Sequence, residues 1–432
     1  MRKAVGHLSA LLKGILFIGF SIQIVLGSVW MCFHFTQVQA FGEPEGFLYP
    51  LLLRIFGNMP QLLYILQLCF AWFAARVLLG PVLGRGVFWR SWQMLALITI
   101  PFAMQCHMAL LPYSFVSSFL FLEVSFCREC MNNEHGVRLT ELARGAACWL
   151  VLALLLPEYG WLGGIPLALT VLLRFPVLKG QLKRMVYCVL LIAAFGGMIA
   201  GVGRLAGHGE EQEKSFWFSL AHRMTWPTIW NDADRWPAEL REIAESVLWD
   251  ATFSPGNMER LLRPAIENAV GTEQAESYYR QMALISWQIH SPVIVRQMGG
   301  DALVYVLPQV MLPLQLEGRG YDSYSGRNYE AMLGRQPKLA SHYVRYSCWW
   351  FKVALGATVL LTVLYLASKK RVYERRTLGF PIMCAISAGA VTAYYVMRGA
   401  GMSDYKCTIA VSMLWAIWML CCVGQEPQDE EE

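Results

Sequence analysis

The chain has 432 residues, of which 56% are hydrophobic and 16% are charged, and its formal net charge is +5. Soluble domains are typically about 45–50% apolar and about 25% charged, so this composition excludes an ordinary soluble protein. The sequence contains no basic tract dense enough for nucleic-acid binding, no phosphate-binding P-loop, and neither the G-x-S-x-G nor the H-E-x-x-H motif of hydrolases.

Long apolar runs with few charges recur toward both ends of the chain. Runs of about 18 or more such residues are long enough to cross a bilayer, and about ten of them predict an α-helical polytopic membrane protein. The stretch 92–127 forms either two short helices around Pro112 or one long kinked helix. The predicted spans are approximately residues 12–33, 60–80, 92–108, 112–127, 143–157, 161–178, 185–204, 347–367, 379–397 and 406–423.

These spans divide the chain into four parts. The predicted parts are an N-terminal membrane module at 1–206 with about seven spans, a soluble domain at 207–346, a C-terminal membrane module at 347–424, and an acidic tail at 425–432. The soluble domain is predicted to be mainly helical, because its apolar residues recur at helical spacing. None of the twelve cysteines lies between Cys188 and Cys348, so this domain depends on its own core and not on disulfides.

The distribution of Lys and Arg predicts the orientation of the chain. With a cytoplasmic N-terminus, the predicted inner segments contain eighteen Lys and Arg residues, and the short outer loops contain three, Arg54, Arg398 and Lys406. Positive residues concentrate in cytoplasmic loops. We therefore predict a plasma-membrane protein with both termini in the cytoplasm and residues 207–346 outside. A cleaved signal peptide ending at Ala40 is the alternative for residues 1–40.

The first outer loop, residues 34–59, combines two acidic residues with a short apolar segment. Glu43 and Glu45 precede the ten-residue stretch 47–56, which is too short to span a bilayer and predicts an interfacial or re-entrant helix with Pro50 near its start. A carboxylate at the membrane surface could act as a general base on an acceptor hydroxyl. The alternative is a pair of solvated loop glutamates. His107, near the outer end of the third span, is an ionisable group within the membrane and a further candidate.

Two polar and aromatic clusters in the soluble domain are candidate substrate-binding sites. Guanidinium groups bind phosphate bidentately, and aromatic faces stack on sugar rings. The alternative is a packing surface held by ion pairs. The residues of the two clusters are His222, Arg223 and Trp226, and then Arg319, Tyr321, Arg327 and Asn328.

The sequence identifies no metal site and no certain cofactor, and it leaves a divalent cation open. Cys127 and Cys130 with His135 resemble a fragment of a zinc site, but structural zinc requires four ligands. Asp232 and Asp234 could hold a divalent cation, although two carboxylates alone indicate this weakly. Glu123, deep in the fourth span, could pair with Arg128 by snorkelling.

The first outer loop resembles that of the GT-C-type membrane glycosyltransferases. The resemblance lies in Glu43, Glu45 and the segment FLYPLLLRIF at 47–56, within a seven-span layout over residues 1–205. It implies a polyprenyl-phosphate-linked sugar donor and catalysis by Glu43 and Glu45. Many members of the class have an Asp or an acidic pair here, whereas in this chain Pro44 separates two glutamates. The function implied is sugar transfer from a lipid-linked donor to an acceptor at the outer membrane face, in cell-envelope glycan assembly.

Three other functions remain open on the sequence. An O-antigen-type polymerase or ligase would depend on His222, Arg223 and Arg327 and not on a first-loop carboxylate. A transporter or flippase would predict charges and broken helices within the membrane, of which the sequence indicates few. The fourth function is a non-catalytic assembly factor.

Overall fold

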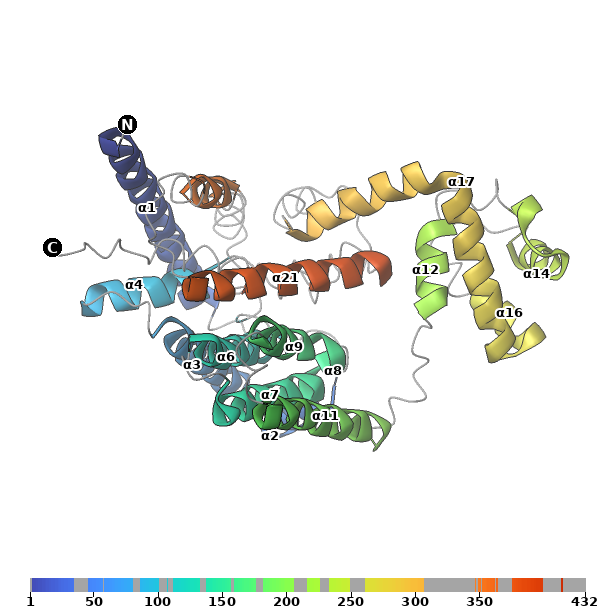
Figure 1. Ribbon diagram of the computed structural model, residues 1–432, viewed down its shortest axis with the longest axis horizontal. Helices are drawn as coiled ribbons and strands as arrows, with labels where there is room; N and C mark the ends of the chain where they lie inside the picture. The colour runs from blue at the N-terminus through green and yellow to red at the C-terminus, as the bar shows by residue number, and fades with distance from the viewer. Residues whose placement is uncertain are drawn as a thin grey trace. The chain divides into compact units, whose positions relative to one another are not determined.

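The computed structural model of the chain is helical. Within the residues that it describes, every regular element is a helix and there is no strand (Figure 1). This confirms the predicted helical class. The described residues are 2–34, 46–56, 58–80, 86–100, 107, 112–132, 137–156, 159–175, 182–205, 216–225, 233–248, 261–306, 346, 349–350, 352–361, 363, 375–398 and 413–414.

The chain divides into two compact units. The first comprises Met1–Ala206, Val306–Val391 and Thr408–Glu432, and the second comprises Gly207–Tyr305 and Thr392–Cys407. The membrane topology assigned above to these parts of the chain stays a prediction.

Several helices of the first unit have the length and apolarity of membrane spans. Among the described residues, three segments are long and apolar enough to cross a bilayer: His7–Val29 within α1 (Arg2–His34), Pro60–Leu79, which is α3, and Lys183–Gly201 within α11 (Leu182–Leu205). The shorter apolar helices are Tyr159–Leu173, Lys352–Leu361 and Ile382–Tyr394, the last within α21 (Arg375–Arg398). These helices are those of a membrane-embedded protein. The number of spans stays a prediction.

In the described part of the stretch 92–127, α4 (Val87–Ile98) and α6 (Tyr113–Asn132) are separate helices. Helix α4 ends before Thr99, and α6 begins directly after Pro112. Proline is well placed at the start of a helix, where no intrahelical N–H bond is lost. Helix α7 (Leu139–Leu155) follows.

The core of the first unit is built around α6. This helix packs against α3, α7 and α9 (Gly164–Leu173), and α7 also contacts α8 (Tyr159–Leu162) and α11, as Figure 1 shows. Val124 of α6 and Leu152 of α7 are fully buried. Several polar side chains are buried here too, and they form the sites described below.

A notch in α1 receives the C-terminal part of the first unit. A Cβ atom built on Gly19 would lie 2.1 Å from the ring of Trp350, so only glycine leaves room for this contact. The Trp350 ring also meets Phe20 edge to face, with centroids 5.5 Å apart, and the Tyr346 hydroxyl donates to the Gly19 carbonyl at 2.8 Å. The two ends of this unit are thus joined halfway along α1.

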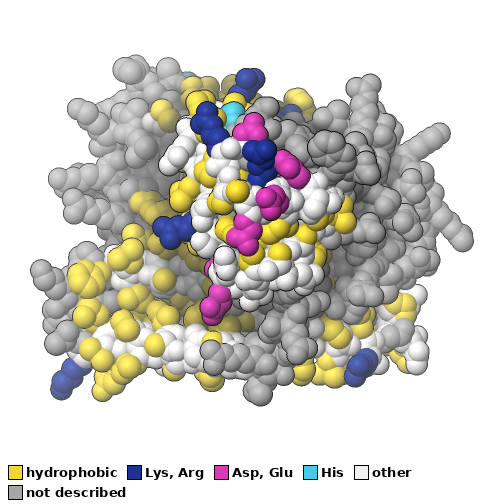
Figure 2. Space-filling model, turned by 90° about the vertical axis from the view of Figure 1, so that its right-hand side faces the viewer, with side chains coloured by type: hydrophobic (Ala, Val, Ile, Leu, Met, Phe, Trp, Pro, Cys, Tyr) yellow, Lys and Arg dark blue, Asp and Glu magenta, His cyan; other side chains and the backbone are white. Residues whose placement is uncertain are grey.

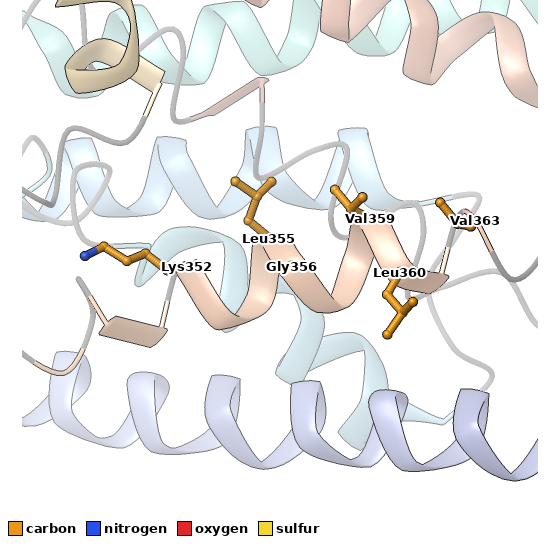
Figure 3. Close-up of a pocket in the computed structure, with 6 residues that line it drawn as sticks. All are labelled: Lys352, Leu355, Gly356, Val359, Leu360 and Val363. Atoms are coloured by element: carbon orange, nitrogen blue, oxygen red, sulfur yellow. The ribbon is translucent and has the colours of Figure 1, made fainter. Parts of the chain in front are cut away.

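The Lys352–Leu361 helix borders an open apolar groove of about 550 Å³ (Figure 3). The described residues that line the groove belong to this helix, apart from Val363, which follows it. Among their side chains, the one polar group is the ammonium of Lys352. An apolar surface of this kind fits apolar chains or a neighbouring helix. The described lining residues are Lys352, Leu355, Gly356, Val359, Leu360 and Val363.

The second unit has a separate helical core. Its elements are α12 (Phe216–Thr225), η2 (Ala233–Arg235), α14 (Ala238–Leu248), α16 (Arg263–Val270) and α17 (Thr272–Val306). Phe218, Leu240, Ile266, Tyr279 and Met282 meet in one buried cluster. Acidic and basic side chains gather over the face of this unit that Figure 2 shows, as expected for a surface in contact with water.

Candidate functional site

The chain that directly follows the two glutamates of the first outer loop is fixed to the end of α7. The Phe47 backbone N–H donates to the Leu154 carbonyl oxygen at 2.9 Å. Gly46 has a φ of +83°, and a Cβ atom there would lie 2.1 Å from the Leu155 carbonyl oxygen. Both the left-handed backbone and the close approach require glycine at this position. The loop therefore has a defined anchor one residue after Glu45.

The predicted short helix is present as α2 (Leu48–Phe56). Tyr49 is fully buried, and its ring lies 6.3 Å from that of Phe115 at the start of α6. Leu51 and Ile55 are exposed on the other side of α2, and Arg54 is exposed in its last turn. A helix with one packed face and one exposed apolar face suits the membrane interface.

His107 belongs to the same region of the first unit. It is fully buried, and its Nδ1 lies 2.7 Å from the Ser114 hydroxyl, one residue before Phe115. Its Nε2 has no hydrogen-bond partner among the described residues. The anchor at Gly46, the helix α2 and His107 thus converge around the N-terminal end of α6.

Most of the predicted site residues lie outside the described residues. They are Glu43, Glu45, Trp226, Arg319, Tyr321, Arg327 and Asn328, and their assignments stay predictions. The predicted site residues that the structure describes are His107, His222 and Arg223, together with the backbone that directly follows Glu45.

His222 and Arg223 lie on α12 in the second unit, and both are half-buried. The His222 ring stacks on Phe218, with centroids 6.0 Å apart, and Phe218 is a core residue. Arg263 also contacts Phe218, because its guanidinium lies over the ring, 4.8 Å from the ring centroid. These contacts pack α12 against the core of the second unit, and the substrate-binding role of His222 and Arg223 stays a prediction.

The second unit holds a buried ion pair beside this ring. The Arg263 Nε donates to Glu267 at 2.8 Å, and the Tyr279 hydroxyl donates to the same carboxylate at 3.5 Å. Burial, aided by the negative charge of Glu267, raises the pKa of Tyr279 above its ordinary value. The tyrosine therefore stays neutral and serves as a hydrogen-bond donor.

The described residues contain no group of three His, Cys, Asp or Glu side chains placed to hold a metal ion. Cys127 and Cys130 are buried on α6, and the Cys130 thiol donates to the Arg138 carbonyl at 3.6 Å. Asp234 is exposed and lies 3.4 Å from Arg241, while Asp232 lies outside the described residues.

The prediction of an ion pair between Glu123 and Arg128 is wrong. Arg128 donates instead to the Leu78 carbonyl oxygen, and its guanidinium lies 5.6 Å from the ring centroid of Phe380. Neither carboxyl oxygen of Glu123 has a hydrogen-bond partner among the described residues. The two side chains are five residues apart and so point about 140° away from each other around the helix.

Comparison with known proteins finds no matching family model, no matching curated protein and no matching solved structure.

Proposed function

We propose that the chain is a membrane glycosyltransferase that moves a sugar from a polyprenyl-phosphate-linked donor to an acceptor at the outer membrane face, in cell-envelope glycan assembly. The observation that supports this most is the anchor after the acidic loop. Gly46 and Phe47 are bound to the end of α7, so the glutamates start from a fixed point on the membrane body.

Chain length limits how far the two carboxylates lie from this anchor. Consecutive Cα atoms are about 3.8 Å apart, so Glu45 lies within about 4 Å of Gly46 and Glu43 within about 11 Å, measured between Cα atoms. In this proposal Glu43, or failing it Glu45, is the general base that removes the proton of the acceptor hydroxyl.

The surroundings of the anchor suit a lipid-borne substrate. Leu51 and Ile55 offer an exposed apolar surface on α2, and Arg54 adds a positive charge in the same helix. A fixed cation at a membrane surface favours the phosphate of a lipid-linked donor and stabilises it as a leaving group. His107 supplies a second polar group near the N-terminal end of α6.

The test is a transfer assay with the full-length protein in proteoliposomes, using polyprenyl-phosphate hexoses as donors. We expect the Glu43→Gln, Glu45→Gln double variant to lose about 10²–10⁴ in rate, because a general base is removed. Donor binding should stay close to that of the unmodified chain, because glutamine keeps the side-chain shape. Glu129→Gln is the control, since Glu129 is exposed at the opposite end of α6.

Near-normal transfer by the double variant would eliminate this mechanism. The polymerase or ligase interpretation would then be tested with His222→Ala and Arg223→Ala, which that function requires for activity.

A further inference from the structure

Glu123 is a buried carboxyl that the proposed glycosyl transfer does not use. It lies near the middle of α6, its side chain has no exposed surface, and both of its carboxyl oxygens lack a hydrogen-bond partner among the described residues. Buried polar groups in proteins nearly always have such a partner. An ionisable group of this kind within a membrane body is a candidate for function.

No cation compensates a charge on this carboxyl among the described residues. Arg128 donates to the Leu78 carbonyl and lies over the Phe380 ring, on another side of α6. Arg144, on the neighbouring α7, pairs with Glu141 at 3.0 Å. Both of these guanidinium groups therefore have partners other than Glu123.

Two cysteine thiols lie close to Glu123 on α6 and α7. The thiols of Cys127, on α6, and Cys148, on α7, are close enough to interact with it electrostatically. Cys384 of α21 is in turn close enough to interact electrostatically with Cys127. The other buried titratable or polar side chains of the helices that pack on α6 are Tyr64 and Gln67 from α3, the paired Glu141 from α7, and Thr170 from α9.

A carboxylate with no partner in a water-free interior is strongly destabilised, whereas the carboxylic acid has no net charge to solvate. We propose that Glu123 is a proton-binding site of the first unit, which holds a proton in the state described and exchanges it when the packing around α6 opens to water. The ligand is a proton. The inference does not depend on the proposed glycosyl transfer.

Exchange requires movement, because a side chain with no exposed surface has no route to water in the packed state. Any reagent that reaches Glu123 must therefore use the same opening. A probe that reacts only with a protonated carboxyl and dissolves in the bilayer tests both parts of the proposal at once.

Dicyclohexylcarbodiimide is such a probe. The carboxylic acid proton moves to a carbodiimide nitrogen, and the carboxylate oxygen bonds to the central carbon to give an O-acylisourea. The acyl group then migrates from oxygen to nitrogen and leaves a stable N-acylurea, so the whole reagent is retained and no co-reactant is needed. Mass spectrometry of the full-length protein in proteoliposomes locates the adduct.

We expect one adduct on the peptide that contains Glu123, with a labelling rate that decreases as pH rises. Glu123→Gln should lose the adduct and Glu123→Asp should retain it, because aspartate keeps the carboxyl. Glu141→Gln is the matched control. Glu141 is also buried but is paired with Arg144, so its replacement should leave labelling unchanged.

Three results would overturn the proposal. The absence of an adduct at Glu123 in the unmodified chain would mean that the site does not open. Labelling that is independent of pH would mean that the proton does not exchange. An adduct that is retained on the same peptide in Glu123→Gln would mean that the reagent reacts with another carboxyl.

Discussion

The sequence predicts which single polar residues lie within apolar segments, but their hydrogen-bond partners depend on how the helices pack. The sequence identifies Glu123, Arg128 and His107 as ionisable groups within apolar runs, but it does not give their partners. The expected pairing of Glu123 with Arg128 fails on helix geometry, since pairs on one face are three or four residues apart and not five. The bond from Arg128 to Leu78 joins α6 to α3, and no local pattern indicates it.

Arg263 allows a buried ion pair to be compared with an exposed one in the same unit. Arg263 and Glu267 have side chains that are only 9% and 14% exposed, whereas those of Arg241 and Glu245 are 44% and 48% exposed, at the same 2.8 Å distance. We expect Arg263→Ala to lower the free energy of unfolding by about 3 kcal/mol, because it leaves a buried carboxylate unpaired.

Pulse proteolysis of the full-length protein, with fragments of the second unit identified by mass spectrometry, measures this effect. The control, Arg241→Ala, should behave nearly as the unmodified chain does, because water solvates both partners of an exposed pair. Equal loss of stability in the two variants would contradict the assignment of Arg263 to a buried network.

At the scale of helices, apolar spacing predicts which segments are helical better than it predicts where each helix begins and ends. The helical pattern at 237–251 corresponds to α14, and the segment 47–56 corresponds to α2. The pattern at 274–289 continues as α17 to Val306, across a kink where His290 has φ −121° and ψ 20°. Pro292 accounts for the kink, because proline lacks an N–H and clashes with the preceding turn.

Contacts between helices account for another difference. The span predicted at 161–178 begins earlier, at Tyr159, and is divided into α8 and α9 at Gly163. The Trp149 indole of α7 donates to the Tyr159 and Gly160 carbonyls, at 3.2 and 3.1 Å. A tertiary contact of this kind satisfies carbonyls near the break and leaves no trace in the local sequence pattern.

Two glycines with similar φ angles test how the chain before α2 is packed against α7. Gly46 and Gly271 have φ values of +83° and +80°, but a Cβ atom at Gly271 meets nothing within 4 Å. Alanine at either position is strained, because L side chains rarely adopt a φ in this range. We expect Gly46→Ala to add a clash with the Leu155 carbonyl oxygen, to lower Tm more than Gly271→Ala does, and to reduce sugar transfer.

Differential scanning fluorimetry of the purified variants gives the two shifts in Tm. If Gly46→Ala and Gly271→Ala proved equally stable, the close contact between the loop and α7 would be refuted.

At the scale of the whole chain, hydropathy and charge predict a helical membrane protein, and the described helices confirm that class. Orientation and the number of spans stay predictions. Two described contacts agree with the predicted topology. Phe47 bonds to Leu154, and both are predicted to lie at the outer membrane surface; Arg128 bonds to Leu78, and both are predicted to lie at the inner surface. The sequence could indicate the acidic loop as a candidate site, but not the glycine anchor that positions it.

The central claim is that the chain crosses the membrane with the second unit outside and the N-terminal end of α7 inside. Labelling of single engineered cysteines with a membrane-impermeant maleimide on intact cells tests it most directly. Ser277, on α17, and Thr140, on α7, are both exposed and suit a cysteine substitution. The unmodified chain gives the background from the native cysteines.

The account predicts that Ser277→Cys is labelled on intact cells and that Thr140→Cys is labelled only after lysis. Labelling of Thr140→Cys on intact cells, or of Ser277→Cys only after lysis, would contradict it.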